Sequence, residues 1–184
     1  MGNRMTALVI NGDTSGSVTL AAPAAAGSTT VNIGATTGTI QAGAPCFSAS
    51  ASGGQTFNSG TTKIQFNTED FDTNNCYDSS TNYRFTPNVA GYYLVTCSMD
   101  VNANTNTLTR AMPWVYKNGA GVKNLPGNWT FTSTELEVGG STLIYMNGTT
   151  DYIEVYAYQG SAGSLSVGSD TSMRPFSAAL IRSV

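Results

Sequence analysis

The densest group of side chains that could do chemistry lies in residues 68–75, which contain Glu69, Asp70 and Asp72. Carboxylate and amide oxygens are the ligands that Ca²⁺ prefers, and two carboxyl groups facing each other across a cleft are what glycoside hydrolysis requires. On a strand, Asp70 and Asp72 would share one face but would form no cleft. The spacing of the calcium-binding EF-hand is also missing. We therefore interpret the segment as a polar loop before a strand, with a calcium site at Asp70 and Asp72 as the alternative.

The sequence contains no histidine. This excludes Ser-His and Cys-His nucleophile pairs and the usual histidine-containing zinc sites. Its three cysteines, Cys46, Cys76 and Cys97, have long spacings and form no CxxC pair. Cys97 lies in an apolar segment and is expected to be buried, whereas a disulfide between Cys46 and Cys76 is left open. We expect no catalytic activity and no cofactor.

Charge and hydropathy exclude several kinds of partner. Charged residues make up 10 % of the 184 residues, with 8 basic and 11 acidic side chains and a net charge of −3. The basic residues are spread from Arg4 to Arg182, so the sequence has no basic stripe of the kind that binds nucleic acid. No apolar run reaches the roughly 18 residues of a membrane-spanning helix, and the first residues lack the apolar segment of a secretory signal. We expect neither nucleic-acid binding nor membrane insertion.

The composition favours strands joined by polar turns. Thr is typical of strands, while Gly, Asn and Ser are typical of turns. Turn residues at Asn118-Gly119, Gly139-Gly140 and Asn147-Gly148 separate short apolar segments. Many short strands without a helical period indicate a β-sandwich or barrel. The predicted strands are 45–50, 62–66, 81–86, 91–101, 110–117, 129–137, 141–147, 151–159 and 175–182.

One predicted strand, 151–159, alternates clearly between two faces. Its apolar face carries Ile153, Val155 and Ala157, and we expect this face to lie in the core. The other face carries three tyrosines, which is unusual for a solvated face. Because aromatic residues are enriched at interfaces, we favour a subunit interface there over isolated surface aromatics. The tyrosines are Tyr152, Tyr156 and Tyr158.

Residues 1–44 differ from the rest of the chain, since all Phe, Tyr, Trp and Cys residues lie after position 44. Short apolar segments separated by glycines indicate short strands with tight turns. Such an arm cannot bury a core by itself and must lie against something larger. We therefore predict an anchoring or trimerising arm at 1–44 and a head domain at 45–184. The residues expected to anchor the arm are Leu8, Val9, Ile10, Val18, Leu20, Val31 and Ile33.

The segment from Phe85 to Val95 resembles the signature of the complement C1q-like globular head. Phe85, Gly91 and Tyr93 match its spacing, and Val95 stands where the family has an aromatic residue. The segment Trp114–Gly119 resembles a hairpin of that family, and residues 175–181, with Phe176, resemble its final strand. The family is a trimeric jelly roll related to the tumour necrosis factor fold. The resemblance, over residues 45–184, implies an all-β jelly-roll sandwich that assembles as a homotrimer and has Phe85, Gly91, Tyr93, Val95 and Phe176 in its core.

Residues 16–40 of the arm resemble a segment of bacteriophage tail-fibre and head-decoration proteins. This resemblance implies a structural virion protein, assembled in the host cytoplasm, whose arm binds the major capsid protein or another virion protein. Our first functional hypothesis is a trimeric capsid decoration protein with a projecting head. The alternative is a tail-fibre tip that binds a glycan or protein on the host surface, and we keep both.

Overall fold

The computed structural model describes residues 7–11, 15, 17–21, 43–102, 109–127, 135–160, 163–167 and 175–184. The chain divides into two compact units, Met1–Gly38 and Thr39–Val184. In the first unit, β1 (Ala7–Asn11) and β2 (Ser17–Ala21) form an antiparallel hairpin with Leu8 opposite Leu20 and Ile10 opposite Val18. Val9 and Ile10 are exposed. Two of the predicted anchor residues, Val31 and Ile33, lie outside the described residues.

The described residues of the second unit, the head, are strands and loops, and they include no helix that could cross a membrane. An all-β head is what the composition predicted. The strands are β3 (Cys46–Ser50), β4 (Thr56–Phe57), β5 (Gly60–Lys63), β6 (Thr68–Asp72), β7 (Tyr77–Asp78), β8 (Arg84–Phe85), β9 (Gly91–Asn102), β10 (Ala111–Lys117), β11 (Ala120–Asn124), β12 (Glu135–Met146), β13 (Ile153–Gln159), β14 (Leu165–Val167) and β15 (Pro175–Ser183).

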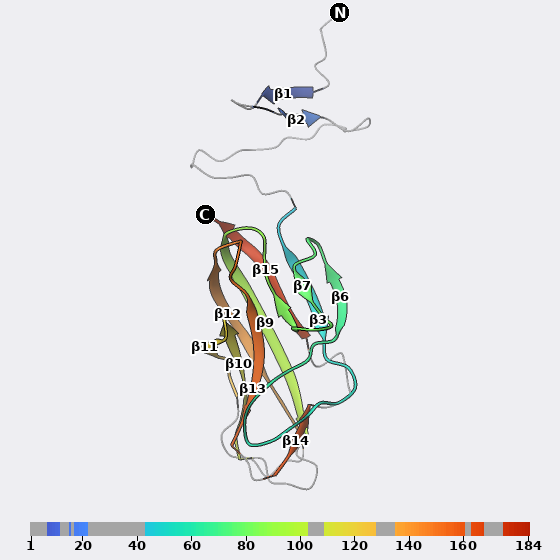
Figure 1. Ribbon diagram of the computed structural model, residues 1–184, viewed down its shortest axis with the longest axis vertical. Coiled ribbons are helices and arrows are strands. Elements are labelled where there is room, and N and C mark those ends of the chain that lie inside the picture. Colours follow the sequence, from blue (N-terminus) through green and yellow to red (C-terminus); the bar gives the residue numbers. More distant parts are fainter. Residues whose placement is uncertain are drawn as a thin grey trace, which may run out of the picture. The chain divides into compact units, whose positions relative to one another are not determined.

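These strands form two antiparallel sheets. Sheet I has the order β4-β14-β9-β15-β3-β6, with β12 paired along β9, and sheet II has the order β11-β10-β13-β8-β7, with β5 paired to β13. The long strands β9 and β12 run side by side in one layer, and β10 and β13 lie in the other (Figure 1). The sheets enclose the core between their facing side chains, as expected for a jelly-roll sandwich.

Alternation along the strands puts one face of each sheet into this core. Along β9, Tyr93, Val95 and Cys97 are fully buried, while the residues between them face outward. Ile153, Val155 and Ala157 of β13 are also fully buried, as their alternation predicted. Aromatic rings fill the centre around Phe47, whose ring centroid lies 4.4 Å from that of Tyr77, 4.6 Å from that of Phe85 and 4.9 Å from that of Phe176.

Gly91 begins β9 and is required by close packing. A Cβ atom at this position would lie 2.3 Å from the carbonyl oxygen of Arg182 and 2.6 Å from a Leu180 methyl carbon. Its φ is not in the left-handed region. Gly91 is needed here because the neighbouring strand β15 excludes any side chain. Of the other residues of the C1q-like motif, Phe85, Tyr93, Val95 and Phe176 are all fully buried.

Three details differ from the sequence-based expectations. The turn predicted at Gly139-Gly140 is wrong: both residues lie inside β12, where a Cβ on Gly139 would meet the Cys97 carbonyl oxygen at 2.5 Å. The polar loop predicted at residues 68–75 is wrong for 68–72, which form the edge strand β6 paired with β3. The possible disulfide is also absent, since all three cysteines are free.

The turn predicted at Asn118-Gly119 is confirmed by the positive φ values of 54° and 80° at its two residues.

Candidate functional site: an apolar face on sheet I

The outer surface of sheet I carries an unusual group of exposed apolar side chains. Because β9 alternates, its outward positions include Tyr92 and Leu94, and β12 places Tyr145 and Leu143 directly opposite them. The Tyr92 and Tyr145 rings are 5.6 Å apart. We name this group the apolar face. Exposed fractions of its members range from 39 % for Leu94 to 58 % for Leu143. Contiguous exposed apolar surface of this kind marks interaction sites.

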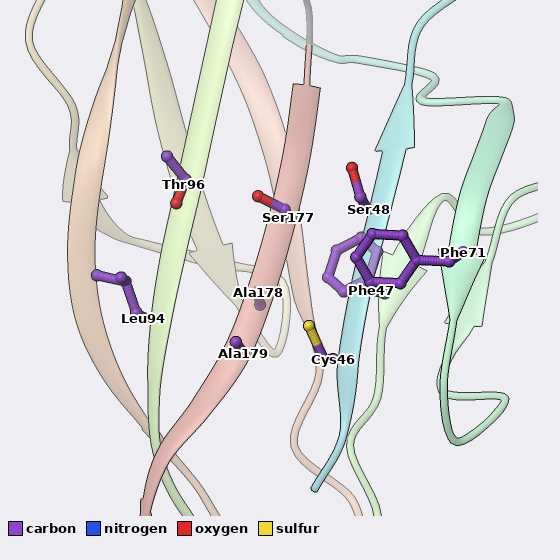
Figure 2. A pocket seen from close by; sticks show the side chains of 9 residues that line it. All are labelled: Cys46, Phe47, Ser48, Phe71, Leu94, Thr96, Ser177, Ala178 and Ala179. Atoms are coloured by element: carbon purple, nitrogen blue, oxygen red, sulfur yellow. The ribbon is translucent and has the colours of Figure 1, made fainter.

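A shallow hollow of about 270 Å³ adjoins the apolar face. Small side chains from β15, including Ser177 and Ala179, lie along its floor. Leu94 stands on β9 at one side of these small residues, and Phe71 projects from β6 at the other (Figure 2). Phe71 is 48 % exposed. The hollow exists because small residues on the two middle strands, β15 and β3, lie between Leu94 on β9 and Phe71 on β6.

Charged residues also lie beside the apolar face: Arg182, which is exposed on β15 opposite Tyr92, and the paired Lys117 and Asp151. Lys117 donates to the carbonyl oxygen of Tyr145 at 2.7 Å and forms an ion pair of 2.7 Å with Asp151. Asp151 also accepts hydrogen bonds from the Asn118 side-chain amide and the Asn147 N–H. Burial by itself raises the pKa of Asp151, but these donors outweigh it and hold the pKa below its ordinary value. The Lys117 ammonium, neutralised by Asp151, lies 5.5 Å from the ring centroid of Tyr145 at the border of the apolar face.

The carboxylates singled out in the sequence serve local structure. Asp70 accepts a hydrogen bond from the Ser48 hydroxyl at 2.8 Å. Asp72 accepts from the Asn74 N–H at 3.2 Å and from the Tyr77 N–H at 2.7 Å, so both of its oxygens have partners. In the part of the chain that the structure describes, no group of three or more cysteine or carboxylate side chains is placed to hold a metal ion.

The three tyrosines predicted as an interface lie on the outer surface of sheet II and are half-buried. Each contacts a charged neighbour: the guanidinium of Arg84 lies 4.5 Å from the Tyr152 ring centroid, and that of Arg110 lies 4.8 Å from the Tyr158 ring centroid. The Tyr156 hydroxyl donates to Glu154 at 3.4 Å. Burial, followed by the nearby Glu154 charge, raises the pKa of Tyr156 to about 12. The interface role of these tyrosines stays a prediction.

Asp78, at the end of β7, makes the head sensitive to acid. Its carboxylate accepts hydrogen bonds from the N–H groups of Ser80, Thr81 and Asn82 and from the Asn82 side-chain amide. The Thr81 bond lowers the pKa most; burial opposes it, but the remaining donors keep the pKa well below its ordinary value. Because the folded pKa is depressed, this stabilisation is complete above the ordinary pKa of about 4 and is lost as the pH falls below it.

We expect Asp78→Asn to lower the free energy of unfolding at pH 7 by about 1–2 kcal/mol, since an amide nitrogen would face the Asn82 donors. The difference from the wild type should shrink as the pH falls from 5 to 2. Urea denaturation at several pH values measures both effects. Asp70→Asn, which affects a single bond to Ser48, is the matched control and should cost less. A difference between Asp78→Asn and wild type that is constant with pH would contradict this account.

With the sandwich and its apolar face described, the fold can be assigned: the head has the tumour necrosis factor-like jelly-roll fold. Murine APRIL at pH 5.0 superposes with a TM-score of 0.57 at 7 % identity, over 75 % of this chain and 99 % of APRIL. The Eiger TNF of S. frugiperda superposes with a TM-score of 0.54 at 9 % identity, over 77 % of this chain and 93 % of Eiger. No protein-family model and no curated protein sequence matches the chain. At these identities the similarity establishes the fold alone.

Sequence reasoning missed the apolar face. In β9 both alternating faces are apolar, with Tyr92 and Leu94 on one and Tyr93 and Val95 on the other. Leu143 likewise gave no sign of being exposed. The signal that could have revealed the apolar face is that both faces of β9 are apolar. A strand of a two-layer sandwich needs apolar residues only on the face that packs against the core.

Proposed function

We propose that the chain is a non-enzymatic structural protein that works as a homotrimer, with the apolar face of sheet I as the contact between subunits. The observation that carries this proposal is the exposure of Leu143, Tyr92 and Tyr145 next to one another on a regular sheet. Leaving such a surface in water is unfavourable by about 25 cal/mol for each Å² of apolar area. A second copy that covers it removes this cost.

The layout of the apolar face supports a ring of subunits. The projecting side chains Tyr92, Leu143 and Tyr145 lie on β9 and β12, whereas the hollow lies over β15, β3 and β6. A projection and a hollow at different places on one face fit a contact in which each subunit presents a different part to its neighbour. Such head-to-tail contacts close into rings when the rotation permits. Three subunits are what the C1q-like and tumour necrosis factor-like resemblance implies.

We further propose that this trimer is a capsid decoration protein of a bacteriophage, anchored through residues 1–44 to the major capsid protein or another virion protein. The support is the resemblance of residues 16–40 to phage head-decoration and fibre proteins, together with the exposed Val9 and Ile10 of the β1–β2 hairpin. Many arms binding one shell would act with avidity, so each contact need only be modest. The alternative is a tail-fibre tip bound to a host surface glycan or protein.

Light scattering coupled to size-exclusion chromatography tests the oligomer. We expect a mass three times the 19.2 kDa of the chain for the wild type. Leu143→Glu places a charge in the contact and should shift the mass to that of one chain. Val122→Glu is the matched control, because Val122 is 43 % exposed on β11 of sheet II; its mass should stay that of the wild type. A monomeric wild type, or a trimeric Leu143→Glu variant with wild-type stability, would overturn the proposed contact.

Electron microscopy of virions labelled at this protein tests the role on the particle. We expect density from this protein on the capsid surface. A variant that lacks residues 1–44 should not bind, so this density should be absent. Label at the tip of a tail fibre would support the alternative function instead. Purified particles that lack the protein altogether would contradict both functions.

A further inference from the structure

The two sheets of the head carry opposite charge. In the described residues, the strands of sheet II and the residues flanking them have five basic and three acidic side chains, a net charge of +2. The strands of sheet I have one basic and six acidic side chains, a net charge of −5. The basic residues of sheet II are Lys63, Arg84, Arg110, Lys117 and Lys123. A chain that is acidic as a whole therefore has one face suited to an anionic partner.

The same face of sheet II carries an aromatic group centred on Trp114. The indole lies directly against β11, because a Cβ on Gly121 would come within 2.5 Å of its ring atoms. Only a glycine permits this approach, and Trp114 is partly buried by it. Tyr116 stands edge-on beside the indole at 5.3 Å, and its ring stacks on that of Tyr156 at 4.0 Å. The arrangement is an indole held against the sheet with a pair of stacked phenol rings beside it.

Charged groups surround this aromatic group. The Lys63 ammonium lies 5.7 Å from the Tyr156 ring centroid and pairs with the buried Glu154 carboxylate. Arg84 lies over Tyr152 farther along the same face. Lys123, although exposed on β11, pairs with the buried Val115 and so lies on the face of β11 opposite to the indole. Lys63 and Arg84, which pair with Tyr156 and Glu154 of β13, are the cations on the outer surface of sheet II.

We propose that this aromatic, basic face binds an anionic polysaccharide, with a sugar ring stacked on the indole of Trp114 and the acidic groups of the sugar near Lys63 and Arg84. The indole supplies a broad apolar surface with a polar N–H, and the ammonium and guanidinium groups supply charge-assisted hydrogen bonds to carboxylate, sulfate or phosphate. The proposal does not depend on the trimer or on the virion role, since it uses the opposite sheet.

The arrangement favours a polysaccharide over single-stranded nucleic acid. Binding of a single strand needs successive aromatic surfaces on which bases stack. Here the Tyr116 and Tyr156 rings stack on each other, so the faces they share are closed to a ligand. The basic side chains are also offset by nearby carboxylates, through the Lys63–Glu154 and Lys117–Asp151 pairs. A net charge of +2 is weak compared with the several phosphate contacts of a nucleic-acid site.

Calorimetric titration of the full chain tests the proposal with four probes: alginate, dextran sulfate, unmodified dextran and a single-stranded oligothymidylate. The two anionic polysaccharides should bind and the neutral dextran should not. Their binding should weaken as salt is raised, because exposed charges are screened. Trp114→Ala should weaken binding about tenfold, which corresponds to roughly 1.4 kcal/mol, and Trp114→Phe should restore part of it.

Controls separate binding from folding and from subunit contacts. Arg84→Gln removes one positive charge from the aromatic, basic face and should weaken binding, while Lys123→Gln removes one from the other face of the sheet and should not. All variants are compared in mass and melting temperature with the wild type. Equal binding by Trp114→Ala and wild type, preferred binding of the oligothymidylate, or a change of mass in a folded Trp114→Ala variant would each overturn the proposal, the last by showing that a second copy occupies this face.

Discussion

Phe47→Ala is expected to lower the free energy of unfolding by about 3–5 kcal/mol, the range found for a large buried aromatic truncated to alanine. Phe47 is fully buried. Its ring lies within 5 Å of the Tyr77, Phe85 and Phe176 rings, measured between centroids. These neighbours come from β7, β8 and β15 and so belong to both sheets. A cavity at Phe47 therefore removes contacts that hold the two layers together.

Urea denaturation at a fixed protein concentration measures this loss, since assembly would change the apparent stability. Phe47→Leu keeps most of the volume and should cost less than about 1.5 kcal/mol. Val122→Ala, at an exposed apolar position on β11, should fall within about 0.5 kcal/mol of the wild type. A loss below 1 kcal/mol for Phe47→Ala would show that the core closes around the missing ring, and that Phe47 is not its centre.

Lys63→Met is expected to have the second-largest effect, a loss of about 2–3 kcal/mol, because it leaves the carboxylate of Glu154 buried without its cation. The Glu154 side chain is 5 % exposed, whereas that of Lys63 is 31 % exposed. Lys63→Met and Glu154→Gln should therefore lower the free energy of unfolding by different amounts. Glu154→Gln leaves the Lys63 ammonium, which water still reaches, and should cause the smaller loss. Lys63 also donates to the Asn82 carbonyl at 3.3 Å, a bond that methionine cannot make.

Stability measurements on Lys63→Met, Glu154→Gln and the double variant form a complete cycle. The double variant should be more stable than the sum of the single losses predicts, because it has no buried charge left unpaired. Lys123→Met, at an exposed position on β11, is the control and should change stability by less than about 0.5 kcal/mol. If Glu154→Gln proved more damaging than Lys63→Met, the burial argument would be wrong.

The strands that the sequence predicted best are those with long alternation or clear turns. The predicted strand 151–159 corresponds to β13, which begins two residues later at Ile153 and ends at Gln159 as predicted. The Asn118-Gly119 turn was predicted because a two-residue hairpin of this kind needs positive φ at both positions. The short strands β4, β7 and β14 contain two or three residues each. No periodicity exists over such lengths, so only pairing with a neighbour defines them.

The sequence by itself determined the all-β class and the buried positions of the C1q-like motif, because composition and side-chain period are local properties of the chain. The tertiary structure alone decided which apolar residues are exposed. Tyr92 and Tyr93 are neighbours of the same type, yet one is 46 % exposed and the other is fully buried. Their exposed fractions differ because sheet II covers only one side of β9. Since sheet II is built from other segments of the chain, the local pattern of β9 does not show which side is covered. For the same reason the apolar face and the indole at Gly121 became visible only once the strands were paired.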